Sequence, residues 1–232
     1  MKRLVTIVAL GLVTATVTPA TAQHGKGSTA TKKTPPKAGA DDGGPTQVDP
    51  KTGQKSKQYT FGGLDIVVNN AGISIVKPAL EMPEKDWDAV VDTNLRGAWL
   101  VAQGAARRWV AEKRPGAIVN IGSILGLRTI GHVAPYNASK AGLVHLTRAL
   151  AMEWARYQIR VNAICPGYIE TEMNSAFWKT PGGQRLIERI PQRRIGQPEH
   201  LDGALLLLAS EAGTFMTGSV LTVDGGHTVS SL

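Results

Sequence analysis

The chain has 232 residues, of which 42% are hydrophobic and 19% are charged, a balance typical of a folded domain rather than a disordered chain. The formal net charge of +8 is unevenly spread: residues 1–22 carry +2, residues 23–60 carry +4 and residues 61–232 carry only +2. Because the excess lies in a tail and no basic helix with interleaved aromatic residues occurs, we expect no nucleic-acid partner. The single cysteine, Cys165, excludes an internal disulfide and a cysteine-based metal site, and we expect no metal.

The first 22 residues contain the three parts of a secretory signal peptide. Residues 2–3 give a charged start, residues 4–17 are mostly apolar, and residues 20–22 supply the small-residue pattern of a cleavage site. The apolar run is shorter than the roughly 20 residues of a membrane-spanning helix. We therefore expect cleavage after Ala22, export to the periplasm or beyond, and no stable membrane span. The alternatives are an uncleaved anchor, or a mis-assigned start that would leave the protein in the cytoplasm.

Residues 23–60 differ in composition from the C-terminal part of the chain. They are rich in Lys, Gly, Pro, Thr and Gln and show no apolar periodicity. Such a segment cannot bury enough apolar surface to offset the entropy of ordering it. We expect a disordered polar linker here, with a turn at residues 48–53.

From residue 64 onward, short apolar runs alternate with helical patterns. Strands are predicted at residues 64–68, 117–121, 159–164 and 219–223. Helices are predicted at residues 83–113, 136–157 and 198–210, where the pattern has helical spacing. The alternation predicts an α/β fold: a partial Rossmann-like, doubly wound parallel sheet of about four strands with helices on both faces.

Ligands of such sheets bind beyond the carboxyl ends of the strands. That rule selects three loops, at residues 69–72, 122–123 and 166–171. We expect the functional site to be formed where these loops meet.

Tyr136 and Lys140 lie four residues apart at the predicted start of a helix, so their side chains share one face. A free tyrosine has a pKa near 10, and a nearby ammonium favours the phenolate and lowers that pKa. Tyr136 could then exchange a proton with an alcohol while a hydride moves to or from the substrate carbon. Ser123 follows a strand, where its hydroxyl could hold the substrate oxygen. Asn94 lies inside a helical pattern, which indicates a kink or a bound water.

The order and spacing of these residues resemble the short-chain dehydrogenase/reductase family. The resemblance runs through residues 62–232 and rests on Asn69-Asn70-Ala71-Gly72, Asn94, Ser123, Tyr136, Lys140, Pro166-Gly167 and the closing residues 217–226. It implies NAD(P)-dependent interconversion of a small alcohol and a ketone. The implied catalytic residues are Asn94, Ser123, Tyr136 and Lys140.

The resemblance also implies a role for each of these residues. Ser123 would orient the substrate oxygen, and Tyr136 would be the general acid/base. Lys140 would contact the nicotinamide ribose and lower the pKa of Tyr136. Asn94 would hold a water in a proton relay to Lys140.

A cofactor cleft, a substrate lid and an oligomer interface are implied by the same resemblance. The implied cofactor-binding residues are Asn70, Ala71 and Gly72 on the adenosine-ribose side, Tyr136 and Lys140 at the centre, and Pro166, Gly167, Ile169 and Thr171 beside the nicotinamide. Residues 171–194, with Phe177 and Trp178, would form a mobile lid over the substrate. Helices 87–113 and 136–157 would pair copies of the chain into a homo-oligomer.

The sequence departs from the family pattern before residue 64. Family members begin with a strand, the motif Thr-Gly-x-x-x-Gly-x-Gly and a helix, which together hold the cofactor pyrophosphate. This sequence contains no such motif in that context. We therefore expect weak or absent cofactor affinity, an exposed edge at strand 64–68 and a fold that is marginal as a monomer.

Three functions remain open at this point. The first is an active oxidoreductase of the family, using either NAD or NADP. The second is a truncated or fused remnant that keeps the catalytic residues without activity. The third is an exported, non-catalytic association domain.

Overall fold

The computed structural model describes residues 63–171 and 174–230 in full, together with the backbones of four strands before residue 63. The chain divides into two units, one of Met1–Pro19 with Leu64–Leu232 and the other of Ala20–Gly63. The first unit contains the sheet, the helices around it and every predicted catalytic residue.

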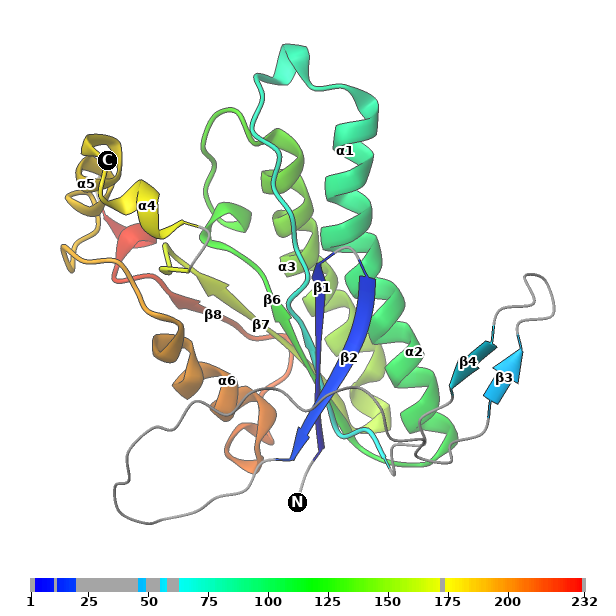
Figure 1. Ribbon diagram of the computed structural model, residues 1–232. Coiled ribbons are helices and arrows are strands. Elements are labelled where there is room, and N and C mark those ends of the chain that lie inside the picture. The colour runs from blue at the N-terminus through cyan, green and yellow to red at the C-terminus, as the bar shows by residue number, and fades with distance from the viewer. Residues whose placement is uncertain are drawn as a thin grey trace, which may run out of the picture. The chain divides into compact units, whose positions relative to one another are not determined.

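Four neighbouring strands of the sheet run parallel to one another (Figure 1). They are β5 (Ile66–Asn69), β6 (Gly116–Ile121), β7 (Ile159–Pro166) and β8 (Val220–Val223). The structure confirms all four predicted strands and the α/β class. Apolar runs of this kind become interior strands because both faces of a parallel sheet are covered.

Two further strands extend the sheet beyond β5. β1 (Arg3–Leu10) pairs in parallel with β5, and β2 (Leu12–Pro19) pairs antiparallel with β1. The sheet therefore has six strands, in the order β2-β1-β5-β6-β7-β8, rather than about four. The prediction that strand 64–68 forms an edge is wrong, because Ile66–Asn69 pairs with β1 on one side and β6 on the other.

The physical reason for this difference lies in the apolar stretch at the N-terminus. Its β-branched residues suit a strand as well as the apolar part of a signal peptide, and composition alone does not distinguish the two. The predicted cleavage site after Ala22 lies outside the described residues. Cleavage there would remove both β1 and β2, so the signal peptide stays a prediction.

The second unit contains one short hairpin. β3 (Thr46–Val48) and β4 (Lys55–Lys57) pair antiparallel, with Thr46 opposite Lys57. Six residues of the predicted linker are therefore strand, and they flank the predicted turn at residues 48–53. The rest of residues 23–60 lies outside the described residues, so its disorder stays a prediction.

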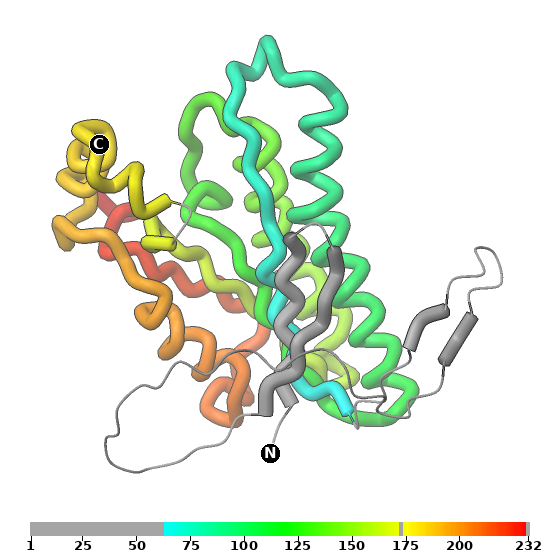
Figure 2. The backbone as a smooth tube through the Cα atoms, in the orientation of Figure 1, coloured from blue at the N-terminus to red at the C-terminus, as the bar shows by residue number. Residues whose placement is uncertain are grey.

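Helices cover the two faces of the sheet unequally (Figure 1, Figure 2). One face carries α1 (Glu84–Val91), the π-helical turn η2 (Asp92–Gly97), α2 (Ala98–Ala111) and α3 (Ala134–Trp154). The other carries α6 (Asp202–Ala209), which follows the 3-10 turn η5 (Pro198–Leu201). The predicted helices are thus confirmed, the first of them interrupted by the π-helical turn.

Successive side chains of each strand point to opposite faces of the sheet and pack into two separate hydrophobic cores. Val67 packs with Trp109 of α2 and Leu150 of α3, whereas Ile66 packs in a second core with Leu208 of α6. This alternation is the two-residue period of a strand, and it fixes which face each helix covers. The two cores hold the strand ends in register, which brings the loops of the site together.

Candidate active site

The predicted site lies at the carboxyl ends of β5, β6 and β7, where the three predicted loops leave the sheet. Because these strands are parallel and in register, the loops emerge at the same edge. Chain segments far apart in sequence thereby become neighbours, as open α/β sheets require for ligand binding.

Ser123 is placed by the end of β6. Its backbone is extended, its side chain is buried, and its Oγ accepts a hydrogen bond from the Leu125 backbone N–H at 3.0 Å. This bond caps the 3-10 turn η3 (Ile124–Gly126) and fixes the direction of the hydroxyl. The Ser123 side chain is also a hydrogen-bonding partner that lowers the pKa of Tyr136.

Tyr136 and Lys140 lie in the first turns of α3, which begins at Ala134 and has Pro135 in its first turn. The Lys140 Nζ lies 5.7 Å from the centroid of the Tyr136 ring, so the predicted shared face is confirmed. Lys140 is 3% exposed, and its ammonium donates to the Ile121 carbonyl at 2.8 Å. The strand end that leads to Ser123 therefore also anchors Lys140.

Burial controls both pKa values. It raises the pKa of Tyr136 above 10, and the hydrogen bond with Ser123 offsets only part of that rise. It lowers the pKa of Lys140 from 10.5 to about 8. Burial of the phenol is the largest cause of the shift, and the expected lowering of the Tyr136 pKa by Lys140 stays a prediction. At neutral pH the phenol of Tyr136 carries its proton.

Asn94 lies in η2, so the predicted irregularity of its helix is confirmed. A π-helical turn inside an α-helix often marks a functional position. The Asn94 Oδ1 accepts from the Ile73 N–H at 2.8 Å, and its Nδ2 donates to the Ile73 carbonyl at 2.9 Å and to the Ser139 Oγ at 3.0 Å. The amide thus ties the loop after β5 to the start of α3. Its predicted water-holding role stays a prediction.

The loop after β5 carries Asn70, Ala71 and Gly72, which the sequence assigned to the cofactor. Gly72 lies directly against two of the predicted catalytic residues: a Cβ there would be 3.3 Å from the Lys140 Nζ and 3.4 Å from the Asn94 Oδ1. Asn70 is exposed and Ala71 is partly exposed. The structure thus brings this loop to Lys140.

The loop after β7 carries Pro166, Gly167, Ile169 and Thr171. Gly167 must lack a side chain, because a Cβ there would lie 2.7 Å from the Asp224 Cα. Ile169 forms a parallel bridge with Gly196. Thr171 is exposed at the start of the predicted lid.

The lid segment contains two short helices, α4 (Ser175–Trp178) and α5 (Pro181–Ile187). Trp178 is buried and packs edge-on against Tyr168, with 5.5 Å between the ring centroids. Phe177 remains exposed. Residues 172–173 lie outside the described residues, and the mobility of the lid stays a prediction.

Four buried polar residues near the site were given no role from the sequence: Asn69, Asn120, Ser139 and Thr147. The Asn69 Nδ2 donates to the Asn120 Oδ1 at 2.8 Å, and the Asn120 Nδ2 donates to the Thr147 Oγ1 at 2.9 Å. This chain of bonds links β5, β6 and α3. An amide inside each of two apolar strand sequences is the pattern that could have indicated them.

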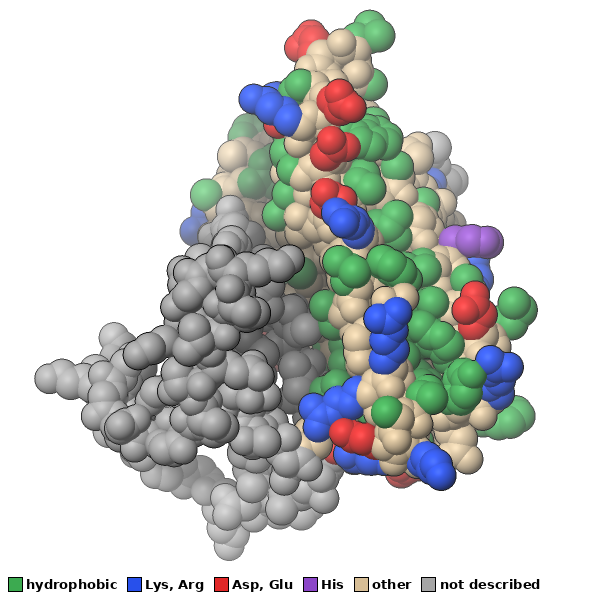
Figure 3. All heavy atoms as spheres, turned by 90° about the vertical axis from the view of Figure 1, so that its right-hand side faces the viewer, with side chains coloured by type: hydrophobic (Ala, Val, Ile, Leu, Met, Phe, Trp, Pro, Cys, Tyr) green, Lys and Arg blue, Asp and Glu red, His purple; other side chains and the backbone are tan. Residues whose placement is uncertain are grey.

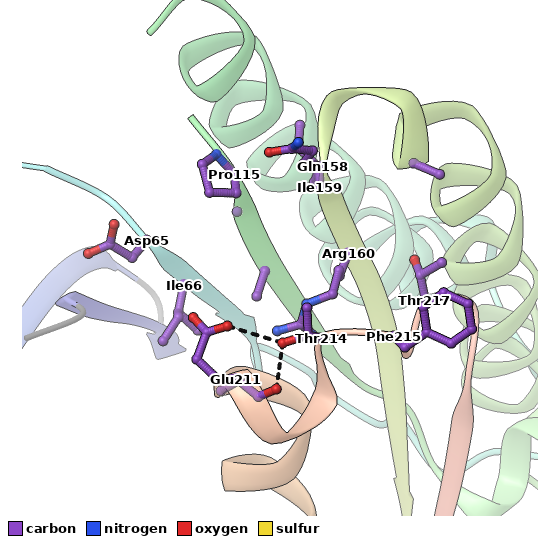
Figure 4. A pocket seen from close by; sticks show the side chains of 14 residues that line it. Asp65, Ile66, Pro115, Gln158, Ile159, Arg160, Glu211, Thr214, Phe215 and Thr217 are labelled. Atoms are coloured by element: carbon purple, nitrogen blue, oxygen red, sulfur yellow. Dashed lines mark hydrogen bonds between the residues drawn. The ribbon is translucent and has the colours of Figure 1, made fainter. Parts of the chain in front are cut away.

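A larger cavity of the described residues lies elsewhere, at the amino ends of the strands (Figure 4). It has a volume of about 710 Å³ and is lined by Ile66, Ile159 and Phe215, among other residues. The Arg160 guanidinium beside it donates to the carbonyls of Leu208 at 2.7 Å and Ser210 at 3.2 Å, which closes the end of α6. This cavity holds none of the predicted catalytic residues, so its size does not make it the active site.

Neither a metal-binding cluster nor a membrane-spanning helix is found among the described residues. No group of three or more His, Cys, Asp or Glu residues suited to a metal ion occurs in that part of the chain. Within the same residues, none of the helices has both the length and the apolar character that spanning a membrane requires.

Comparison with known proteins shows the family. The profile of a family described as Enoyl-(Acyl carrier protein) reductase matches residues 49–228. The chain is 41% identical over 169 residues to 2-dehydro-3-deoxy-D-gluconate 5-dehydrogenase of Escherichia coli, and 40% identical over 172 residues to 3beta-hydroxysteroid dehydrogenase 1 of Eggerthella lenta. The chain belongs to the short-chain dehydrogenase/reductase family.

The matches cover most of this chain but a smaller share of its relatives. The E. coli match covers 72% of this chain and 66% of the relative, and the E. lenta match covers 74% and 66%. A crystal structure of gluconate 5-dehydrogenase from Burkholderia cenocepacia, in complex with NADP and tartrate, matches with a TM-score of 0.70 and 40% identity. That match covers 73% of this chain and 67% of the other.

Proposed function

We propose that this chain catalyses the NAD(P)-dependent interconversion of a secondary alcohol and a ketone, with Tyr136 as general acid/base. The observation that carries the proposal is the meeting of Ser123, Tyr136 and Lys140 at the carboxyl edge of the sheet. The relatives support it, because their names are those of dehydrogenases and reductases and several of their structures contain NADP or NADH.

The nicotinamide-ribose end of the cofactor fits the residues present. The Lys140 ammonium has three hydrogens, and among the described residues one of them is bonded, to the Ile121 carbonyl. Because residue 72 is a glycine, the space beside that ammonium is open, and a side chain at residue 72 would fill it. Lys140 and Gly72 would hold the ribose, and the residues from Pro166 to Thr171 would flank the nicotinamide, which supplies or accepts the hydride when bound.

The side chains of the site suit proton transfer to a ketone oxygen. Ser123 is held by Leu125 and can donate its hydroxyl hydrogen to that oxygen. Tyr136 keeps its proton at neutral pH because burial raises its pKa, so it can act as the acid that protonates the same oxygen. Lys140 lies close enough to stabilise the phenolate that remains. In alcohol oxidation the same groups would act in reverse.

The pyrophosphate end of the cofactor has no counterpart of the glycine-rich motif in this sequence. Backbone N–H groups of such a motif, at a helix N-terminus, hold phosphate charge in the family pattern. We therefore keep the prediction that cofactor affinity is weak. If the chain is instead an inactive remnant, we expect no cofactor binding at all.

Titration of the purified protein with NADH and with NADPH, followed by nicotinamide fluorescence, tests the proposal. We expect saturable binding that is weakened at least tenfold in Lys140→Ala, because the ribose contact is lost. The matched control is Lys179→Ala, an exposed lysine on the lid whose loss should leave binding unchanged. No saturable binding to the full chain would favour the remnant.

The exposed surface of α2 and α3 favours a second candidate function, association between copies of the chain. Figure 3 shows apolar side chains between charged ones on the face that α1 and α2 present. A groove of about 590 Å³ is lined by residues of α2, α3 and the turn after α3, among them Trp99, Val110 and Tyr157, each of which is more than one-third exposed. Light scattering should show a defined oligomer that Trp99→Glu converts to a monomer. A monomeric wild type would contradict association.

The predicted export signal determines where the site could meet a cofactor, since nicotinamide cofactors are mainly cytoplasmic. We propose that the signal is used and that the mature chain begins at Gln23. Sequencing of the N-terminus of the protein isolated from its native cell tests this. An intact Met1 would retain β1 and β2 and would contradict export by cleavage.

A further inference from the structure

The hydroxyl of Ser139 lies between Asn94 and Tyr136, and neither the sequence nor the proposed function gives it a role. Ser139 is 1% exposed, on α3, next to Lys140. Its Oγ accepts from the Asn94 Nδ2 at 3.0 Å and donates to the main-chain carbonyl of Tyr136 at 2.9 Å. The hydroxyl therefore joins the π-helical turn η2 to the helical turn that carries Tyr136.

The hydrogen bonds of Asn94 show that this contact is specific. A side-chain amide has two hydrogens to donate and a carbonyl oxygen with two lone pairs. Both hydrogens of the Asn94 Nδ2 are used, one by the Ile73 carbonyl and one by Ser139. Asn94 is fully buried, so removal of the Ser139 hydroxyl would leave one amide hydrogen without its partner in a place that water does not reach.

A second, nearly identical set of bonds lies two turns further along α3. The Thr147 Oγ1 accepts from the Asn120 Nδ2 at 2.9 Å and donates to the Leu143 carbonyl at 2.8 Å. Thr147 is also fully buried. The two hydroxyls thus have the same chemistry and the same burial, but only the first of them bonds to the main chain of Tyr136.

We propose that Ser139 is a positioning residue that holds the first turn of α3, and with it the Tyr136 phenol, in the orientation needed for proton transfer. The inference rests on the proposed function of Tyr136. The first turn of a helix has backbone N–H groups without helical partners and frays more easily than the interior, so an added side-chain bond to its main chain can hold it in place. Ser139 donates a hydrogen bond to the Tyr136 carbonyl, and Asn94 in η2 holds the Ser139 hydroxyl in place.

The test compares Ser139→Ala with Thr147→Val as a matched control. Both variants lose one buried hydroxyl and leave one asparagine hydrogen unpartnered, so both should lower the urea midpoint of unfolding. Only Ser139→Ala should also lower kcat, by about tenfold, because a small misplacement of a reacting group has a large kinetic effect. The KM for the nicotinamide cofactor should stay within about twofold of the wild-type value. Ser139→Thr, which keeps a hydroxyl, should restore most of kcat.

A second measurement does not depend on turnover. The ionisation of the Tyr136 phenol is followed by phenolate absorbance, with Tyr136→Phe subtracted to remove the other tyrosines. In Ser139→Ala the titration should move down towards that of an exposed tyrosine, because the loosened turn admits water to the phenol. In Thr147→Val the titration should not move.

Equal effects of the two variants on kcat and on the phenol titration would overturn the inference and leave Ser139 a merely structural residue. Failure of the proposed function has a different signature, namely no turnover in the wild type. In that case the phenol titration still decides: a shift confined to Ser139→Ala supports positioning of Tyr136, and its absence overturns it.

Discussion

The two ends of the parallel strands differ in what they hold. At the carboxyl ends, the loops after β5, β6 and β7 converge on buried polar groups that bond to one another, including Asn94, Ser139 and Lys140. At the amino ends lies a cavity of about 710 Å³, and Arg160 beside it caps the end of α6. The proposed site is thus distinguished by converging polar side chains of perturbed pKa and not by the volume of a cavity.

Opposite outcomes are expected at the two ends. Changes at the carboxyl ends should remove activity while the protein stays folded. Changes at the amino ends should lower stability while the folded fraction keeps its specific activity.

The largest effect is expected for Tyr136→Phe at the carboxyl ends. Loss of the hydroxyl removes the proton donor, and we expect kcat to fall by about 10³-fold. The rate of NAD(P)H oxidation with a ketone substrate measures this, and circular dichroism checks that the fold is retained. Activity within a few-fold of the wild type would show that Tyr136 is not the general acid.

The next largest effect is expected at the amino ends, for Gly116→Ala. A Cβ at residue 116 would lie 2.3 Å from the Trp109 ring, and Trp109 is fully buried with its Nε1 bonded to the Leu64 carbonyl. Overpacking of this kind should lower the free energy of unfolding by about 3 kcal/mol. Denaturant unfolding measures it, with the exposed Gly104→Ala on α2 as control, since nothing lies within 4 Å of a Cβ there. An unchanged unfolding midpoint would contradict the close packing of Gly116 against Trp109.

Lys140 should make stability depend on pH. Its pKa is about 8 in the folded chain and 10.5 when the side chain is fully solvated, so between these values the unfolded chain binds a proton that the folded chain does not. The free energy of unfolding therefore rises with pH in this window. The raised pKa of Tyr136 acts in the opposite direction, but only above pH 10.

Lys140→Met isolates that contribution. The stability of the wild type relative to this variant should rise by about 2 kcal/mol between pH 8 and pH 10. Urea unfolding at several pH values measures the difference. A difference that stays constant over this range would mean that Lys140 is not desolvated in the folded chain.

The smallest effect is expected for Gly72→Ala. The new Cβ would lie 3.3 Å from the Lys140 Nζ and 3.4 Å from the Asn94 Oδ1, so these groups would have to move by a few tenths of an ångström. We expect about a tenfold loss of kcat/KM with little change in stability. Steady-state kinetics beside thermal unfolding would separate the two effects, and a large loss of stability with normal kinetics would contradict a functional role for this glycine.

Local sequence patterns predicted the strands and the pairing of Tyr136 with Lys140. The four apolar runs are short and bounded by Gly or polar residues, and a four-residue spacing on a helix places two side chains on one face whatever surrounds them. The irregularity at Asn94 was predictable for the same reason, because an amide in a helix interior competes with the backbone. These features depend on neighbours in sequence.

The features that the sequence did not predict depend on neighbours in space. The apolar stretch at residues 4–17 suits a signal peptide and a strand equally, and its pairing with β5 could not be predicted from composition. The rise in the pKa of Tyr136 has no sequence signal because the burial that causes it arises from tertiary packing. The bonds of Ser139 and Thr147 to asparagines 45 and 27 residues away have no sequence signature.

The central claim is that the carboxyl-end site transfers a hydride to a carbonyl carbon while Tyr136 protonates the oxygen. The most direct test is to mix the full-length protein with a ketone and NADH or NADPH deuterated at the reactive nicotinamide carbon, and to analyse the alcohol formed by mass spectrometry. We expect deuterium on the carbinol carbon of one enantiomer, and no labelled alcohol with Tyr136→Phe under the same conditions. Saturable cofactor binding without label in the alcohol, or equal labelling by both proteins, would contradict the claim.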